Sequence, residues 1–314
     1  MIVITGATGH LGNNFARLLI QEHLPHKILV RSITDAISDL NTITVQGDIF
    51  DEEFLHSQVK SSDILVHLAG YIDLTNKHLE ECILVNDFGS KTIIDFCYKN
   101  NIRLIYTSSV DVIDRDSKQT HIKEPTSFHP EKCQSNYAFT KGQATKYLYN
   151  MIETKHMNAC IIYPSAIIGI HDYKPSAAGH EIIKALHKNI FFYVNGGYNF
   201  VDVQDISKII KIIVEKNFTG SVIIGGHNVT IKRFYQCINE VLNKKAIYIY
   251  IPKWIALFFS QFSKTFSKMM VKAVFDNYNY DLSKMESLFH FRLKTFEDTV
   301  EDTTSWFQTY FQKK

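Results

Sequence analysis

The chain reads Met1-Ile-Val-Ile-Thr-Gly-Ala-Thr-Gly-His-Leu-Gly12 at its start, an apolar strand that leads directly into three evenly spaced glycines. Glycine permits a tight turn and lets backbone N–H groups approach a phosphate, and the N-terminus of a following helix favours an anion. The strand before this spacing and the amphipathic run Leu11–Ile20 after it favour a dinucleotide pyrophosphate site over an ordinary turn. We expect the cofactor to contact Gly6, Thr8, Gly9, His10, Leu11 and Gly12.

The second predicted strand, Lys27–Val30, should end near the adenosine ribose, and Arg31 follows it directly. Enzymes that select NAD place an acidic side chain there for the ribose 2′-hydroxyl, whereas arginine suits the 2′-phosphate of NADP. The first acid after this strand is Asp35. The sequence therefore favours NADP(H), with NAD(H) as the second cofactor and a solvated surface arginine as the other interpretation.

A third predicted strand, Ile43–Gln46, is followed by Gly47-Asp48-Ile49. Asp48 and Ile49 are placed to contact the adenine edge of the cofactor. Asp48 could equally be a turn residue before a helix, for which Asp51 is the expected N-cap.

A candidate proton-transfer site comes later, where Tyr137 and Lys141 lie four residues apart on one face of a predicted helix. A free tyrosine has a pKa near 10, and a lysine beside it should lower that value by about 2–3 units. Tyrosine and lysine at this spacing on an exposed helix are the alternative. Ser109, just beyond the strand Leu104–Thr107, is the hydroxyl expected to orient a substrate carbonyl, because Ser108 should point to the opposite side.

Taken together, these motifs resemble those of the extended short-chain dehydrogenases/reductases, the NAD-dependent epimerase/dehydratase superfamily. The resemblance covers nearly the whole chain and is nearest to the dihydroflavonol-4-reductase-like and 3β-hydroxysteroid-dehydrogenase-like branch. It is carried by residues 5–12, 47–49, 67–70, 85–86, 107–109, 137–141, 163–165, 199–206, 280–284 and 302–306.

This resemblance implies an NAD(P)-dependent oxidoreductase with a Ser-Tyr-Lys mechanism. It also implies that Lys141 hydrogen-bonds the nicotinamide ribose and that Asn86 supports the lysine through water. An interior helical asparagine bonded to backbone is the alternative for Asn86. Further cofactor contacts are implied at Leu68, Ala69, Gly70, Tyr163, Pro164 and Ser165.

The expected reaction is hydride transfer between the nicotinamide and a carbonyl or alcohol carbon, with Tyr137 as the general acid in reduction. Dehydratases of this family carry Asp-Glu after the catalytic hydroxyl, whereas this chain has Val110-Asp111, and the second half holds only two arginines, Arg233 and Arg292. These departures favour a small or apolar carbonyl substrate. An NAD-retaining nucleotide-sugar epimerase and a non-catalytic dinucleotide-binding regulator are the alternatives.

Several residues should lie at the mouth of the nicotinamide cleft. Asp111 could recognise a substrate hydroxyl or amine there, or it could be a solvated loop acid. Tyr71 and Asp73 are undecided in the same way. The residues expected to contact substrate are Tyr71, Asp73, Ser109, Val110 and Asp111.

The alternation of apolar strands and helical stretches up to about residue 163 predicts an α/β fold, a Rossmann-type doubly wound parallel sheet. We expect residues 1–163 to form the dinucleotide-binding domain with the catalytic residues, and residues 164–314 to form mostly a smaller mixed α/β substrate lobe. Some segments of the second half should return to the first domain. Helices are expected near residues 179–188, 205–216, 231–242 and 298–311, and short strands at 222–224 and 247–251.

The composition suits a cytoplasmic protein with a small-molecule substrate. The formal net charge of +2 does not point to nucleic acid, and five cysteines without C-x-x-C spacing indicate reduced thiols. The 14 histidines include no H-x-H or H-x-x-x-H pair, so no metal site is predicted.

The segment 251–275 alternates apolar clusters with lysines and is too interrupted to span a membrane. It should be core or a lid over an apolar substrate, with an interfacial helix in peripheral contact with a membrane as the alternative. The family resemblance suggests a homodimer through residues 78–99 and 135–153.

Overall fold

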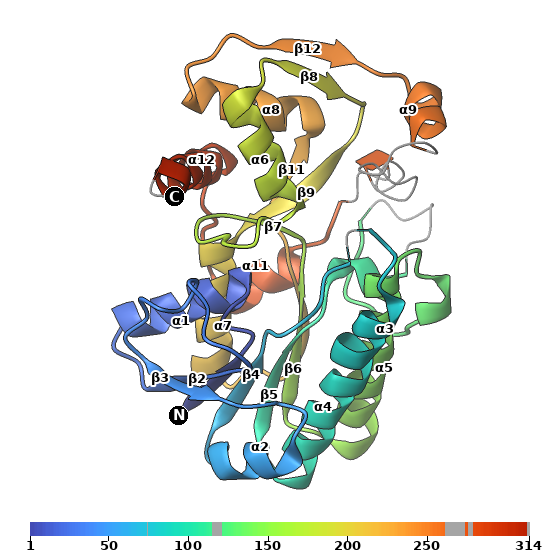
Figure 1. Cartoon of the computed structure of the whole chain (residues 1–314). Helices are drawn as coiled ribbons and strands as arrows, with labels where there is room; N and C mark the ends of the chain where they lie inside the picture. Colours follow the sequence, from blue (N-terminus) through green and yellow to red (C-terminus); the bar gives the residue numbers. More distant parts are fainter. Residues whose placement is uncertain (74, 115–120, 261–273, 276–278, 313–314) are drawn as a thin grey trace.

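The computed structural model describes residues 1–73, 75–114, 121–260, 274–275 and 279–312. Its centre is a parallel sheet of seven strands in the order β10-β6-β5-β4-β1-β2-β3 (Figure 1). This order contains the 3-2-1-4-5-6 arrangement of a Rossmann fold, so the predicted doubly wound sheet is confirmed. The strands are β1 (Ile2–Thr5), β2 (His26–Val30), β3 (Ile43–Gln46), β4 (Ile64–His67), β5 (Arg103–Thr107), β6 (Ala159–Pro164) and β10 (Gly220–Ile224).

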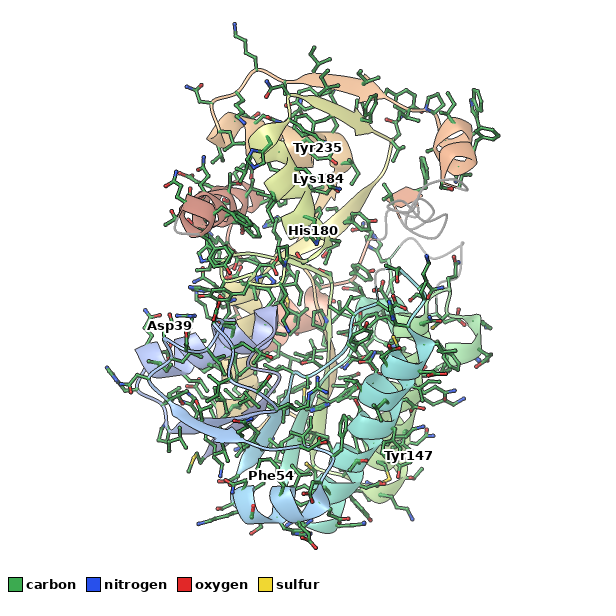
Figure 2. The ribbon with its side chains drawn as sticks, in the orientation of Figure 1. Asp39, Phe54, Tyr147, His180, Lys184 and Tyr235 are labelled. Carbon is green, nitrogen blue, oxygen red and sulfur yellow. The ribbon has the colours of Figure 1, made fainter. Side chains whose placement is uncertain are left out.

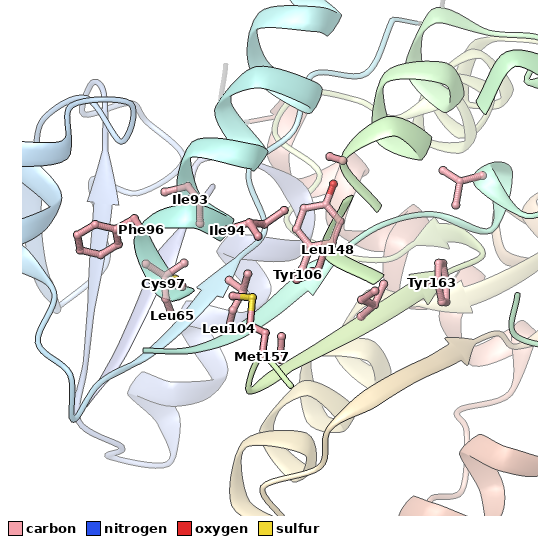
Figure 3. Packing of buried hydrophobic residues seen from close by; sticks show 14 of the residues in the cluster. Leu65, Ile93, Ile94, Phe96, Cys97, Leu104, Tyr106, Leu148, Met157 and Tyr163 are labelled. Atoms are coloured by element: carbon pink, nitrogen blue, oxygen red, sulfur yellow. The ribbon is translucent and has the colours of Figure 1, made fainter. Parts of the chain in front are cut away.

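Helices cover both faces of this sheet, which is why its central strands are continuous apolar runs rather than alternating ones. Phe15 of α1 (His10–Gln21) and Ile209 of α7 (Val203–Glu215) belong to the core on one face. On the other face lie α2 (Glu52–Gln58), α4 (Ser90–Lys99) and α5 (Asn136–Lys155). Figure 3 shows the buried cluster of this second face, with Ile93 and Phe96 packed near Leu65 and Leu104 of the strands.

Between β4 and α4 the chain forms α3 (Leu79–Cys82) and then a π-helix, η1 (Ile83–Gly89). This helix begins at Leu79, and in its π-helical part each backbone hydrogen bond spans five residues instead of four. Such π-helical turns occur most often at functional sites. Asn86 lies within this turn and is fully buried.

The second half of the chain builds two small sheets. One has the order β11-β9-β7 and the other pairs β12 with β8 in parallel. The predicted helices of this half are confirmed within a few residues. Its strands are β7 (Ala166–Ile168), β8 (Ile190–Tyr193), β9 (Gly197–Asp202), β11 (His227–Thr230) and β12 (Ile247–Tyr250), and its other helices are α6 (Ala177–His187), α8 (Ile231–Val241), α9 (Lys253–Phe259), α11 (Ser283–Phe289) and α12 (Phe296–Gln312).

Two elements from beyond residue 163 join the first sheet. The predicted strand at 222–224 is part of β10, which pairs with β6 in parallel at the sheet edge. The preceding helix, α7, packs against α1.

Arg103, at the start of β5, fastens α7 to the sheet. Its buried guanidinium donates to the backbone carbonyls of Ile213, Val214 and Phe218 at 2.8–3.1 Å and to Asn217 Oδ1 at 2.8 Å. A cation at this end of the helix also suits the helix dipole.

No helix in the described ranges is long and apolar enough to cross a bilayer. Of the segment 251–275, residues 253–259 form α9, and residues 261–273 lie outside the part of the chain that the structure describes.

We expect Arg103→Met to lower the free energy of unfolding by about 3 kcal/mol, because four hydrogen bonds from a charged donor are lost in a buried place. Urea unfolding measures the change. Arg292→Met is the matched control, since Arg292 is exposed, and it should stay within about 0.5 kcal/mol of the wild type. Equal effects of the two substitutions would contradict the role given to Arg103.

Candidate active site

The glycine turn after β1 leaves no room for side chains. Gly6 has φ +80°, and a Cβ there would lie 2.5 Å from Ala69 N. A Cβ at Gly12 would lie 2.3 Å from Gly6 O. Gly9, the N-cap of α1, brings no side chain to the first-turn amides of the helix. The turn therefore presents backbone N–H groups at a helix N-terminus, as a pyrophosphate site requires.

The other predicted residues of this turn have different surroundings. Leu11 is buried in the core and Thr8 is half-buried. The His10 ring is directed to the second half of the chain, where its Nε2 lies 3.0 Å from Ile170 O and its Nδ1 4.0 Å from an Asp172 oxygen. His10 thus links the glycine turn to the loop that follows β7.

Arg31 is exposed just beyond β2. The loop that it begins is fixed on α1, since Asn13 Nδ2 donates to Ala36 O at 2.6 Å and Arg17 pairs with Asp39 at 2.8 Å. No acidic side chain follows β2 before Asp35, so the position is open to an anionic group.

Asp48 is also exposed, and its Oδ1 accepts a hydrogen bond from Phe50 N at 3.0 Å, as a turn residue does. Its neighbour Ile49 is buried in the core. Asp51 caps α2 as predicted, accepting from Glu53 N and Phe54 N.

Lys141 lies on α5 and is almost wholly buried under the ends of two strands. Its Nζ donates to Thr107 O at 2.9 Å and to Ala69 O at 3.5 Å, and lies 4.8 Å from the centre of the Tyr106 ring. Burial lowers the pKa of Lys141 to about 7. A Cβ at Gly70 would lie 3.3 Å from Lys141 Cε, so a side chain there would press on the lysine.

Tyr137 is half-buried one turn before Lys141, and Ser109 comes to it from the end of β5. The expected lowering of the Tyr137 pKa is wrong for this structure. Burial raises the pKa of Tyr137, the nearby Asp111 charge adds to the rise, and a hydrogen bond with Ser109 only partly opposes it. The Lys141 ammonium is turned to two backbone carbonyls instead, as described above.

The two serines after β5 differ as expected. Ser108 Oγ lies 2.7 Å from Thr145 Oγ1 in the interior, whereas Ser109 Oγ donates to Asp111 Oδ2 at 3.2 Å. Ser109 also accepts from Asp111 N at 3.1 Å. Ser109, Asp111 and Tyr137 are therefore gathered at one place, while the side chain of Val110 is buried in the core.

Asn86 holds the backbone of Tyr71 from both sides. Its Oδ1 accepts from Tyr71 N at 2.8 Å, and its Nδ2 donates to Tyr71 O at 2.8 Å and to Thr140 Oγ1 at 3.3 Å. Of the two interpretations of Asn86, the described contacts match the asparagine bonded to backbone. It fixes the strand end beside Gly70.

Asp73 is buried and organises its own loop. Its oxygens accept from the backbone and hydroxyl of Thr75, from His78 N and from Asn136 Nδ2. Burial raises the pKa of Asp73, but these hydrogen bonds outweigh it and lower the pKa to about 2. A structural role accounts for these contacts without a substrate. Tyr71 is half-buried and lies edge-on to His78.

Tyr163, Pro164 and Ser165, at the end of β6, differ in their surroundings. The Tyr163 side chain is fully buried in the cluster of Figure 3, so only its backbone could face a ligand. Ser165 N donates to Ile224 O at 3.0 Å, and Ser165 Oγ has no hydrogen-bond partner among the described residues. A buried hydroxyl without a partner suits contact with a bound group. Pro164 lies between them.

Sequence reasoning missed Tyr198 on β9. Burial raises the pKa of Tyr198 to about 12, with the Asp111 charge as the second cause, so its phenol lies near Asp111. The only signal in the sequence was its position next to the recognised segment 199–206.

Sequence reasoning also missed the roles of His67 and Thr5. His67 Nδ1 lies 2.8 Å from Thr5 Oγ1, which ties the ends of β4 and β1 together. Burial and the nearby Lys141 lower the pKa of His67 to about 3, so this histidine is neutral. Among the described residues no three His, Cys, Asp or Glu side chains cluster as metal ligands would.

Known proteins resemble this chain over most of its length. The model of the 3-beta hydroxysteroid dehydrogenase/isomerase family matches residues 3–217. A protein of Synechocystis sp. (strain ATCC 27184 / PCC 6803 / Kazusa) named "Putative dihydroflavonol 4-reductase" is 25% identical over an alignment 325 positions long, which covers 98% of this chain and 94% of the relative.

Solved structures share the fold. A dTDP-glucose 4,6-dehydratase from Bacillus anthracis str. Ames in complex with NAD has a TM-score of 0.76 at 19% identity, covering 99% of this chain and 97% of that one. A UDP-N-acetylglucosamine 4-epimerase from Methanobrevibacter ruminantium M1 has a TM-score of 0.79 at 20% identity, covering 98% of each. The chain therefore belongs to the 3-beta hydroxysteroid dehydrogenase/isomerase family, within the NAD(P)-dependent extended short-chain dehydrogenases/reductases.

Proposed function

We propose that the protein is an NADPH-dependent reductase of a ketone or aldehyde, which in reverse oxidises the alcohol. The observation that carries this proposal is the gathering of Ser109, Tyr137 and Lys141 beside the glycine turn at the carboxyl edge of the sheet. That edge is where open α/β sheets bind their ligands.

The reduced nicotinamide would supply the hydride to the carbonyl carbon. Ser109 would then hydrogen-bond the carbonyl oxygen, and Tyr137 would give that oxygen its proton. A raised pKa keeps the Tyr137 phenol protonated at neutral pH, which suits a proton donor to an alkoxide. Lys141, with a pKa near 7, would supply a proton to the phenolate and hydrogen-bond the nicotinamide ribose, for which its ammonium would give up the long contact with Ala69 O.

The cofactor preference rests on Arg31. Its guanidinium is exposed at the end of β2, where the ribose of the adenosine would lie, and Ser32 beside it adds a hydroxyl. The glycine turn, Leu68 to Gly70 and the unpartnered Ser165 hydroxyl would hold the rest of the dinucleotide.

The substrate would lie between the sheet edge and β9. Asp111 and Tyr198, which lie near each other, would recognise a polar group on it. Arg233, one of two arginines in the second half, is already paired with Glu240 and Glu297. A substrate diphosphate would therefore depend on lysines rather than arginines for its cations, and the shortage of arginine favours a small or apolar carbonyl compound.

A nucleotide-sugar epimerase that retains NAD is the second candidate, favoured by the fold that the chain shares with the nucleotide-sugar enzymes above. Such an enzyme returns the hydride to its substrate, so the purified protein would show the absorbance and fluorescence of bound nicotinamide. A reductase purified without cofactor would not.

A homodimer through residues 78–99 and 135–153 stays a prediction. Its support is the exposure of Leu79, Ile83, Leu84 and Phe88, each at least 40% accessible, on α3 and η1. The molar mass in solution tests it.

Tyr137→Phe should lower kcat/KM for carbonyl reduction at least about a hundredfold, because the proton donor is lost. The Kd for NADPH should stay within about twofold of wild type. NADPH oxidation with a panel of ketones and aldehydes measures the first, and tryptophan quenching the second. Tyr149→Phe, on the same helix, is the matched control and should keep its activity. A Tyr137→Phe variant with near-normal turnover would rule out this mechanism.

Arg31→Ser should weaken NADPH binding about tenfold or more, which is ~1.4 kcal/mol, and leave NADH binding within about twofold. The wild type should prefer NADPH by a similar factor. Titration of the cofactor-free protein with each nucleotide measures both, with Arg292→Ser as the control. Equal or tighter binding of NADH by the wild type would contradict the preference and favour the epimerase. Binding of neither nucleotide would contradict the reductase and the epimerase alike.

Lys141→Met should change how stability depends on pH. The Lys141 pKa is about 7 in the folded protein and 10.5 as the ordinary value, so between these the unfolded chain binds more protons. As the pH rises over this range, the free energy of unfolding of the wild type should increase by up to about 1.4 kcal/mol per pH unit relative to that of the variant. Urea unfolding at pH values near 7 and 9 measures the difference. Lys146 is exposed on the same helix, so Lys146→Met is the control, and its stability should depend on pH as that of the wild type does. If stability depends on pH in the same way in all three proteins, the pKa of Lys141 is not lowered by folding.

A further inference from the structure

The ribbon formed by β8 and β12 has two different faces. Successive side chains of a strand point to opposite sides, so the register that pairs Ile247 with Ile190 and Ile249 with Phe192 places these four on one face. Each is between 41% and 61% accessible. This face is apolar and open.

The opposite face of the ribbon is already packed. Phe191 lies against Tyr248 with ring centroids 6.0 Å apart and against Tyr235 of α8 at 4.7 Å. Figure 2 shows Tyr235 beneath the ribbon, where its hydroxyl donates to Glu181 at 2.7 Å. The exposed isoleucines and Phe192 are therefore not needed to hold the ribbon in place.

Helix α9 lies at the same end of the molecule as the ribbon (Figure 1). It follows β12 directly, after Ile251 N has continued the ribbon by donating to Tyr193 O at 2.8 Å. Trp254 and Phe258 lie four residues apart on one face of α9 and are 72% and 55% accessible. Trp254 is the most exposed of the large apolar side chains in the described ranges. We call Ile190, Phe192, Ile247, Ile249, Trp254 and Phe258 the ribbon face.

The exposed lysines Lys188, Lys245 and Lys253 come just before the ribbon-face residues of β8, β12 and α9 in the chain. The nearby acid Glu240 lies beside Tyr248, which belongs to the other face of the ribbon. From residue 241 to residue 260 the sequence holds three lysines and no Asp or Glu. The overall charge of the chain is only +2, so this stretch is locally basic against a nearly balanced background.

We propose that the ribbon face docks on the surface of an anionic lipid bilayer. Lysines around an apolar, tryptophan-bearing surface match the two layers of such an interface, with cations among the headgroups and apolar side chains at the acyl boundary. A protein partner on this face would need acidic side chains opposite the lysines. The ribbon face of a second copy contains no acidic side chain.

The docking is shallow. A two-stranded ribbon keeps unpaired backbone N–H and C=O groups along its outer edges, and these groups need water in a membrane setting. The ribbon must therefore stay at the level of the headgroups while its side chains reach inward. The inference does not depend on the proposed function, because binding is measured without substrate or cofactor.

Co-sedimentation with vesicles tests the proposal. The full chain should bind vesicles of phosphatidylcholine mixed with phosphatidylglycerol, and bind much less to phosphatidylcholine alone. Raising the salt concentration should release it in part, since screening weakens the lysine contribution.

Variants locate the contact. Trp254→Ala combined with Phe258→Ala, and separately Phe192→Ser combined with Ile249→Ser, should each lower vesicle partitioning at least about fivefold. Lys245→Glu should lower it by about fivefold or more. Ile43→Ser is the matched control, because Ile43 is 59% accessible on β3 of the other sheet, and it should bind like wild type. Circular dichroism of each variant confirms that it is folded.

Absence of binding to anionic vesicles overturns the proposal. So does binding that the Ile43→Ser control loses as readily as the ribbon-face variants do. Concentration-dependent self-association that the ribbon-face variants abolish, without vesicle binding, would instead identify a second copy as the occupant.

Discussion

The buried ammonium of Lys141 is the contact on which the arrangement of the site depends. It joins three elements, because it projects from α5 and donates to carbonyls at the ends of β5 and after β4. Burying a cation has a desolvation cost on the order of several kcal/mol, which two carbonyls and the Tyr106 ring offset only in part. The pKa of Lys141 is lowered because these contacts do not fully offset the desolvation cost. Because Tyr137 lies one turn away on the same helix, the phenol is held in register with Ser109.

Those parts of the fold that follow from local constraints were predictable. Apolar runs predicted strands of the main sheet such as Lys27–Val30, Ile43–Gln46 and Leu104–Thr107, since a parallel strand that is covered on both faces is apolar throughout. The glycine spacing located the turn, and the close approaches at Gly6 and Gly12 explain why no other residue would serve. The Asp51 cap and the helices of the second half followed from capping and periodicity in the same way.

What the sequence could not show was the outcome of contacts between distant segments. Spacing placed Lys141 beside Tyr137 but could not reveal that its ammonium is directed to backbone carbonyls, so the direction of the Tyr137 pKa shift came out wrong. The same limit applies to Asp73, which lies in a loop and accepts one of its four hydrogen bonds from Asn136 at the start of α5. The approach of Tyr198 to Asp111 depends on where β9 lies relative to the end of β5, and no local pattern encodes that position.

Asp111 affects both tyrosines of the candidate site. Its charge contributes to the raised pKa of Tyr137 and to that of Tyr198. Both phenols are therefore protonated across the physiological range, and the group nearest to the expected carbonyl oxygen is a donor rather than a base. Oxidation of an alcohol would need the opposite, a phenolate ready to accept a proton, which the acid disfavours. In the reductase proposed above, the charge of Asp111 would thus help to keep the Tyr137 phenol as the proton donor.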